Sequence, residues 1–276
     1  MDIFQQILKK AEHEGQMDPR LVEALSGKKA IYWNVKRLQL PPIMTSLPEN
    51  VIYALQKIME NIRQVSESKS AQIIGFTSAI PHQGTSTMIS LLSLLMAARE
   101  KMSYEQIQAK NKNSQENFQL KHGVLLIDCQ MHNPSLHHKF GLQQSGGIFE
   151  VLENELPSDK LVKSIEASAL KIVTTGNYKE FHLAQNHLEK FKSLLGNAKK
   201  RVRFIFIDLP PVLAYSECVS LGRLCDGIVL VLQAGNSRWE VLQEARRHLE
   251  RADIPILGGV VNRREYVIPS WVYRNI

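Results

Sequence analysis

The chain has 276 residues, of which 44% are hydrophobic and 22% are charged, and its formal net charge is +7. This composition is typical of a globular protein, and no apolar run reaches the roughly 18 to 20 residues that span a bilayer. The N-terminal residues lack the apolar core and cleavage site of a secretory signal, so we expect a cytoplasmic protein unless a partner recruits it to a membrane. The positive charge is spread along the chain and indicates no nucleic-acid partner.

The N-terminal part of the chain is predicted to be helical and separate from the main domain. Apolar residues recur at helical spacing within residues 1–26, and the prolines within 27–48 indicate an extended linker. A clear amphipathic helix follows over residues 49–65 and is expected to end at the polar run SESKS. We therefore divide the chain into an N-terminal segment, 1–48, and a domain, 49–276, that begins with this lead-in helix.

Beyond residue 70, strand-like apolar runs alternate with helical segments. The strand-like runs lie at 72–76, 124–127, 171–174, 204–207, 227–232 and 256–261, and the helical segments at 87–99, 185–195, 218–224 and 238–251. Several strand-like runs are continuously apolar, as is typical of strands buried on both faces of a parallel sheet. The succession predicts an α/β fold with a doubly wound, mostly parallel sheet. A polar stretch, 103–121, is interpreted as a mobile insertion between a helix and the next strand.

A turn rich in small and hydroxyl residues connects the first predicted strand to the first predicted helix. Residues 75–87 read GFTSAIPHQGTST. Backbone N–H groups in such a turn, together with the N-terminus of the following helix, attract phosphate. The complete motif has Gly-Lys-Ser/Thr at its end, whereas Gly84 is followed here by Thr85, Ser86 and Thr87. The sequence predicts either a phosphate loop that has lost its lysine or a plain structural turn.

Two further strand-like runs end in an aspartate. Asp128 follows VLLI, and Asp208 follows FIFI. Acidic residues at the carboxyl ends of parallel strands face the ligand crevice of such a sheet. Carboxylate oxygens suit Mg²⁺ bound to a nucleotide phosphate, so Ser86, Asp128 and Asp208 form a candidate metal site. The alternative is that both aspartates cap neighbouring turns.

Four segments together carry a family resemblance. They read TSAIPHQGTST at 77–87, VLLIDCQMHNPSLHHKFGL at 124–142, FIFIDLPPVLAYSE at 204–217 and ILGGVVN at 256–262. The corresponding motifs are approximately TSA-x-PGEGKST, VLLIDADLRRPSLH, IIDTPP and VLGVVLN in the cytoplasmic tyrosine autokinases of bacterial capsule and exopolysaccharide synthesis. The chain resembles these kinases, which are relatives of the MinD/ParA-type ATPases and have the P-loop NTPase fold.

The resemblance implies ligands, site residues and partners. It implies ATP or ADP with Mg²⁺ at residues 84–87, with Asp128 and Asp208 in the catalytic role. It also implies that Asn262 contacts adenine, although a polar residue can simply end a strand. The expected partner is an integral membrane polysaccharide co-polymerase, which would recruit the chain to the inner face of the membrane, and a homo-oligomer is also compatible with the resemblance.

Several departures from the family motifs coincide at the site. Thr85 replaces the lysine, Gln130 replaces the second acidic residue, and His132-Asn133 replaces the basic pair. The C-terminal tyrosine cluster, the usual autophosphorylation target, is reduced to Tyr266 and Tyr273. We therefore expect a degenerate kinase homologue that regulates polysaccharide synthesis or export. The alternatives are an active tyrosine kinase or slow ATPase of that pathway, and a MinD/ParA-like positioning ATPase.

Overall fold

A mostly parallel sheet forms the centre of the protein. The computed structural model describes residues 49–69, 72–110, 122–153, 155, 157, 161–165, 168–177, 183–235 and 238–263. Seven strands in this part of the chain are ordered β3-β4-β2-β5-β1-β6-β7, and only β3 is antiparallel to its neighbour. They are β1 (Ile73–Ser78), β2 (Val124–Asp128), β3 (Lys163–Ser164), β4 (Leu170–Val173), β5 (Phe204–Asp208), β6 (Gly227–Gln233) and β7 (Ile256–Asn262).

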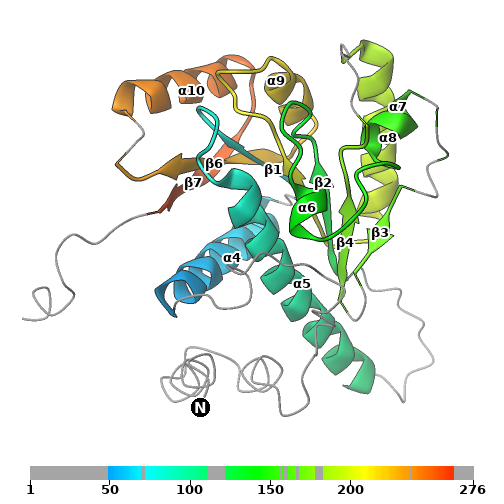
Figure 1. Cartoon of the computed structure of the whole chain (residues 1–276). Helices are drawn as coiled ribbons and strands as arrows, with labels where there is room; N and C mark the ends of the chain where they lie inside the picture. Colours follow the sequence, from blue (N-terminus) through cyan, green and yellow to red (C-terminus); the bar gives the residue numbers. More distant parts are fainter. Residues whose placement is uncertain are drawn as a thin grey trace, which may run out of the picture.

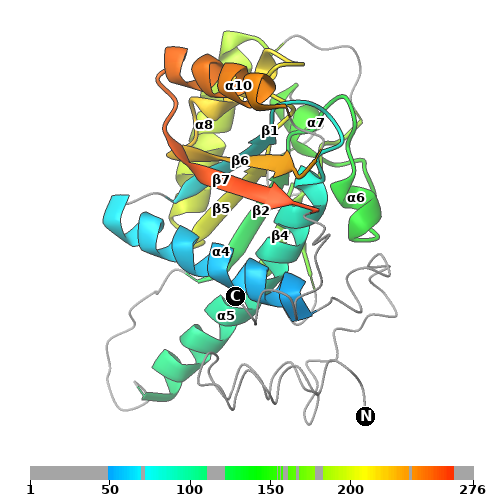
Figure 2. The same ribbon diagram turned by 90° about the vertical axis from the view of Figure 1, so that its left-hand side faces the viewer.

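Helices cover both faces of this sheet, as the doubly wound prediction requires (Figures 1 and 2). They are α4 (Glu49–Lys69), α5 (Thr85–Lys110), α6 (Leu136–Lys139), α7 (Ile148–Leu152), α8 (Gln185–Lys199), α9 (Glu217–Gly222) and α10 (Trp239–Arg251). Figure 2 shows α4 and α8 on opposite sides of the sheet. The predicted α/β class with a mostly parallel sheet is confirmed.

Side-chain alternation along β5 explains why the strand is apolar throughout. Ile205 and Ile207 belong to the core on the side of α8, α9 and α10. Phe204 and Phe206 belong to the core on the side of α4 and α5. Because successive side chains of a strand point to opposite faces, a strand covered by helices on both faces needs apolar residues at every position.

Helix α4 packs on the sheet through the apolar stripe that its sequence predicts. Leu55, Met59 and Ile62 are buried in the same core as β1 and α5. An ion pair of 3.0 Å between Arg99 and Glu60 joins α5 to α4 outside this core. No described helix has the length and apolarity needed to cross a membrane.

Two predicted helix ends are wrong, for the same reason. Helix α4 continues through most of SESKS, where Arg63 and Glu67 form an i,i+4 ion pair of 2.6 Å. Helix α5 continues past residue 99 to Lys110, so the first part of the predicted insertion is helical. Both stretches are polar but rich in helix-forming residues, and polarity alone does not distinguish an exposed helix from a loop. Residues 111–121 lie outside the described residues.

Short elements were not predicted from the sequence. Strand β3 has 2 residues, α6 has 4 and α7 has 5, too few for a periodic pattern to emerge. The predicted N-terminal helices and linker (1–48) and the two C-terminal tyrosines, Tyr266 and Tyr273, lie outside the described residues.

Candidate nucleotide site

The predicted phosphate loop connects β1 to the N-terminus of α5. Gly84 has φ +81°, a conformation that glycine adopts without strain, and its carbonyl accepts the amide of Met88 at 3.0 Å in the first turn of the helix. Thr85, Ser86 and Thr87 therefore lie in the first turn, where unpaired N–H groups point outward. The local backbone is that of an anion site at a long helix, which has 26 residues.

Gln83 links this loop by hydrogen bonds to the ends of β6 and β7. The residue is 2% exposed, and its Oε1 accepts the amide of Gln233 in β6 at 2.6 Å. Its backbone carbonyl accepts Nδ2 of Asn262 in β7 at 2.9 Å. Asn262 thus reaches the phosphate loop, while its contact with adenine stays a prediction. Sequence reasoning missed Gln83, because a buried glutamine inside a turn has no characteristic pattern.

Asp128 and Asp208 face each other on neighbouring strands. They are partners in the parallel register of β2 and β5, and both are 0% exposed. Burial raises the pKa of Asp208 to about 8, and the Asp128 carboxylate acts in the same direction, whereas Ser86 beside it lowers the pKa. Burial also raises the pKa of Asp128. The amides of Gln130 and Leu136 lower this pKa, because they donate to its two oxygens at 3.0 and 3.1 Å. Two buried carboxylates this close are costly without a cation.

Two buried polar atoms at this edge have no hydrogen-bond partner within the described part of the chain. They are Oδ2 of Asp208 and Oγ1 of Thr85, and the Thr85 residue is only 5% exposed. Buried polar groups are nearly always paired, so these two atoms lie where a ligand or ion would fit. The three predicted metal-site residues, Ser86, Asp128 and Asp208, fit Mg²⁺ because they offer only hydroxyl and carboxylate oxygens. The structure therefore brings together the residues predicted for the loop and for the metal.

Gln130 occupies the position of the missing second acidic residue. Its Nε2 donates to the Leu209 carbonyl at 2.8 Å and lies 3.4 Å from Oδ1 of Asp208. The amide thus ties the segment after β2 to the segment after β5. It gives Asp208 a donor, where a carboxylate would add a third negative charge.

A cation that the sequence did not single out lies near the aspartates. Lys139 ends α6, one helical turn after Leu136, whose amide binds Asp128. Burial lowers the pKa of Lys139, while Asp208 and Asp128 raise it. Lys139 could not be predicted from the sequence, because its place near the carboxylates depends on the position of α6 and nothing in the local sequence marks a lysine of a four-residue helix.

His132, one of the two residues at the position of the family's basic pair, contacts the segment that follows β5. The ring of His132 stacks on Tyr215 with centroids 3.8 Å apart and planes 9° apart. Its Nε2 lies 3.4 Å from Oε1 of Glu217. This contact joins the segments that follow β2 and β5, beside the aspartates that end those strands.

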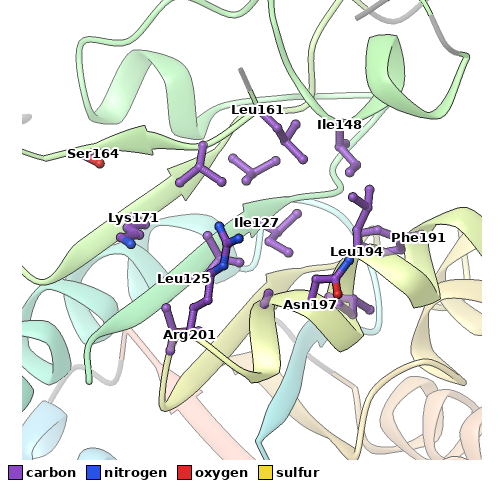
Figure 3. A pocket seen from close by; sticks show the side chains of 15 residues that line it. Leu125, Ile127, Ile148, Leu161, Ser164, Lys171, Phe191, Leu194, Asn197 and Arg201 are labelled. Carbon is purple, nitrogen blue, oxygen red and sulfur yellow. The ribbon is translucent and has the colours of Figure 1, made fainter. Parts of the chain in front are cut away.

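A separate cavity of about 560 Å³ lies against one face of the sheet (Figure 3). Leu125 and Ile127 of β2 and Phe191 of α8 are among the apolar residues that line it, and Lys171 and Arg201 are its basic residues. None of the residues predicted for the phosphate loop or the metal lines this cavity. It is distinct from the nucleotide site.

Comparisons with known proteins find relatives among the tyrosine-protein kinases. No protein-family model matches the chain. Tyrosine-protein kinase YwqD of Bacillus subtilis is 25% identical over 208 residues, which cover 75% of this chain and 79% of YwqD. Tyrosine-protein kinase Etk of Escherichia coli is 20% identical over 239 residues, which cover 85% of this chain but only 30% of Etk.

Solved structures give the same relationship. The VpsO kinase domain is 28% identical with a TM-score of 0.59, and the match covers 78% of this chain and 97% of that domain. The kinase domain of Escherichia coli ETK has the same fold, with a TM-score of 0.67 at 19% identity over 83% of each chain. MinD of Pyrococcus horikoshii, solved with Mg-ADP, shares the fold at a TM-score of 0.51 and 19% identity, over 74% of this chain and 76% of MinD. The chain is therefore a homologue of the bacterial tyrosine-protein kinases, built on the P-loop fold that they share with MinD-type ATPases.

Proposed function

We propose that this protein is a degenerate tyrosine-kinase homologue that binds ATP or ADP with Mg²⁺ weakly and phosphorylates tyrosine poorly or not at all. The observation that supports the proposal most is that the carboxyl edge of the sheet keeps the aspartates of the site but lacks the lysine. The two buried carboxylates, Asp128 and Asp208, are present and in register, while the buried hydroxyl of Thr85 stands where the lysine belongs.

Weak nucleotide binding is supported by what the site retains. The helix N-terminus and the glycine turn provide N–H donors for phosphate. Ser86, Asp128 and Asp208 would hold the Mg²⁺ ion, which when bound supplies positive charge against the phosphate oxygens. Such an ion would also relieve the repulsion between the two carboxylates and the cost of burying them.

Poor phosphoryl transfer is supported by what the site has lost. Phosphoryl transfer depends almost wholly on positioning and on neutralising charge. Thr85 cannot supply a cation, and Gln130 cannot accept a proton or act as a carboxylate ligand. A lost hydrogen bond to a charged group weakens binding by roughly 10- to 150-fold, and turnover should suffer more than binding does.

The cellular role is inferred from the family resemblance. We assign the protein to polysaccharide synthesis or export, as a cytoplasmic partner of a membrane co-polymerase. Glycosyltransferase and export genes beside its own gene would support this role, whereas division or partition genes would favour a positioning ATPase. An active kinase is the second candidate, favoured by the retained Ser86 and aspartate pair.

Autophosphorylation distinguishes the two candidates. The purified full chain is incubated with γ-labelled ATP and Mg²⁺, and phosphotyrosine is measured over time beside an Asp208→Ala variant. We expect a signal near background in both proteins. Robust phosphotyrosine that disappears in Asp208→Ala would establish the active kinase and refute the proposal.

A further inference from the structure

We propose that Arg263 supplies the cation that the phosphate loop lacks at residue 85, by contacting phosphate oxygens of the bound nucleotide. This inference rests on the proposed function, because it assumes that the loop binds a nucleotide. Arg263 directly follows β7, which is far from the loop in sequence and adjacent to it in the fold.

The side chain of Arg263 lies against the turn that would hold phosphate. Its Nε is 3.9 Å from the position that a Cβ atom on Gly84 would occupy. Its Nη1 donates to Oε1 of Gln233 at 3.3 Å, which fixes one side of the guanidinium. The residue is exposed, and no carboxylate in the described part of the chain pairs with it. A guanidinium has five N–H donors, and the bond to Gln233 uses one of them.

The backbone at this position is unusual in a way that fits a binding role. Arg263 has φ +53°, in the left-handed region that non-glycine residues seldom occupy. His82, in the loop itself, has φ +66°. Such conformations persist when surrounding contacts impose them, and they cluster at ligand sites.

Asn262 imposes the conformation at Arg263 and couples it to the loop. Oδ1 of Asn262 accepts the amide of Arg263 at 2.9 Å, and Nδ2 of the same side chain donates to the Gln83 carbonyl at 2.9 Å. The side chain of Asn262 therefore binds both the phosphate loop and the backbone of Arg263.

The chemistry of arginine suits this task. A guanidinium presents a planar fork of donors that binds phosphate oxygens in pairs, and it stays charged at all accessible pH values. Lys139, a second cation near the site, interacts with the two aspartates instead. The two cations thus flank different parts of the site, and Arg263 is the one that lies against the phosphate loop.

The test is titration of fluorescently labelled ADP with Mg²⁺ into the full chain and its Arg263→Gln variant. We expect Arg263→Gln to weaken binding by about 10- to 100-fold, from the usual strength of a charged hydrogen bond. Arg251→Gln is the matched control, because Arg251 is an exposed arginine on α10 with 72% of its side chain accessible. This control should bind ADP as tightly as the wild type does, because the loss of a positive charge far from the phosphate loop should not weaken binding.

Two further variants keep the test informative. Arg263→Gly suits the positive φ, so it should lose affinity as Arg263→Gln does without loss of thermal stability. Thr85→Lys should improve binding more in the Arg263→Gln background than in the wild type, because each cation makes the other partly redundant. Unlabelled adenosine, which has no phosphate, should bind the wild type and Arg263→Gln equally well when it competes with labelled ADP.

The outcomes separate the two proposals. If the wild type binds no labelled ADP, the proposed function fails and Arg263 has no ligand to contact. If the wild type binds and Arg263→Gln binds within about twofold of it, the role of Arg263 is overturned while the proposed function stands. If adenosine binding falls as much as ADP binding does, the arginine serves the base and the phosphate contact is refuted.

Discussion

If the carboxylate pair serves a ligand rather than the fold, as we propose, replacing Asp208 by asparagine should stabilise the protein. Asp208 is 0% exposed, its Oδ2 has no hydrogen-bond partner in the described part of the chain, and Asp128 faces it in register. An uncompensated buried polar group costs about 1–3 kcal/mol, and more when it is charged. Since 1 kcal/mol shifts the melting temperature of a domain this size by about 2–4 °C, we expect Asp208→Asn to melt roughly 2–12 °C higher at pH 8.

The stability that Asp208→Asn gains over the wild type should increase as the pH rises. The folded-state pKa of Asp208 is raised from the ordinary 3.8 to about 8, so between these values the folded chain keeps a proton that the unfolded chain releases. The stability of the wild type therefore falls as pH rises through this interval. Asparagine does not ionise, so the advantage of Asp208→Asn should be near zero at about pH 4 and reach its full value above about pH 8.

Thermal unfolding in EDTA at a series of pH values measures this effect. Asp226→Asn is the matched control, since Asp226 accepts the amides of Gln72 and Ile73 at 2.8 and 2.7 Å and pairs with Lys199 at 3.1 Å. That variant should melt lower, because a fully partnered carboxylate is lost. A lower melting temperature for Asp208→Asn at pH 8, or a gain that does not change with pH, would show that the buried Asp208 carboxylate does not destabilise the fold.

Three further predictions concern the loop, the lead-in helix and the thiols. Thr85→Lys should strengthen nucleotide binding by about one to two powers of ten in calorimetry while phosphotyrosine stays near background, and unchanged affinity would mean that the loop no longer binds phosphate. Met59→Ala should cost about 2–5 kcal/mol in urea unfolding, whereas Tyr53→Ala on the exposed side of the same helix should cost under about 0.5 kcal/mol; equal losses would contradict the packing of α4. Burial raises the pKa of every thiol, so a thiol reagent should label none in the native protein and all after unfolding; labelling of the native protein would be inconsistent with the burial of Cys129, Cys218 and Cys225.

The long elements could be predicted because their patterns follow from burial. Strand β5 is apolar at every position before its closing aspartate, since helices cover both faces of the sheet, and that aspartate marks the ligand edge. The same logic locates the phosphate loop and places Asp128 and Asp208 at one edge of the sheet from the sequence alone. These features depend on local sequence and on the general geometry of parallel sheets.

The contacts that complete the site could not be predicted, because they join segments far apart in the chain. Gln83 and Asn262 are 179 positions apart, and nothing in either segment encodes their hydrogen bond. Lys139 lies in a helix of 4 residues, too short to show a period. The length of α5 was underestimated for a different reason, since an exposed polar helix and a polar loop have similar compositions.

Nucleotide binding itself is measured by calorimetric titration of ATP and ADP into the purified full chain, first with Mg²⁺ and then with EDTA. Because two buried carboxylates are costly without a cation and Thr85 stands at the position of the lysine, we predict binding that requires Mg²⁺ and is weaker than the low-micromolar range. Absence of binding at millimolar nucleotide would contradict the account, and the domain would then be purely structural. Low-micromolar binding accompanied by phosphotyrosine would contradict it in the opposite direction, because the protein would be a working kinase.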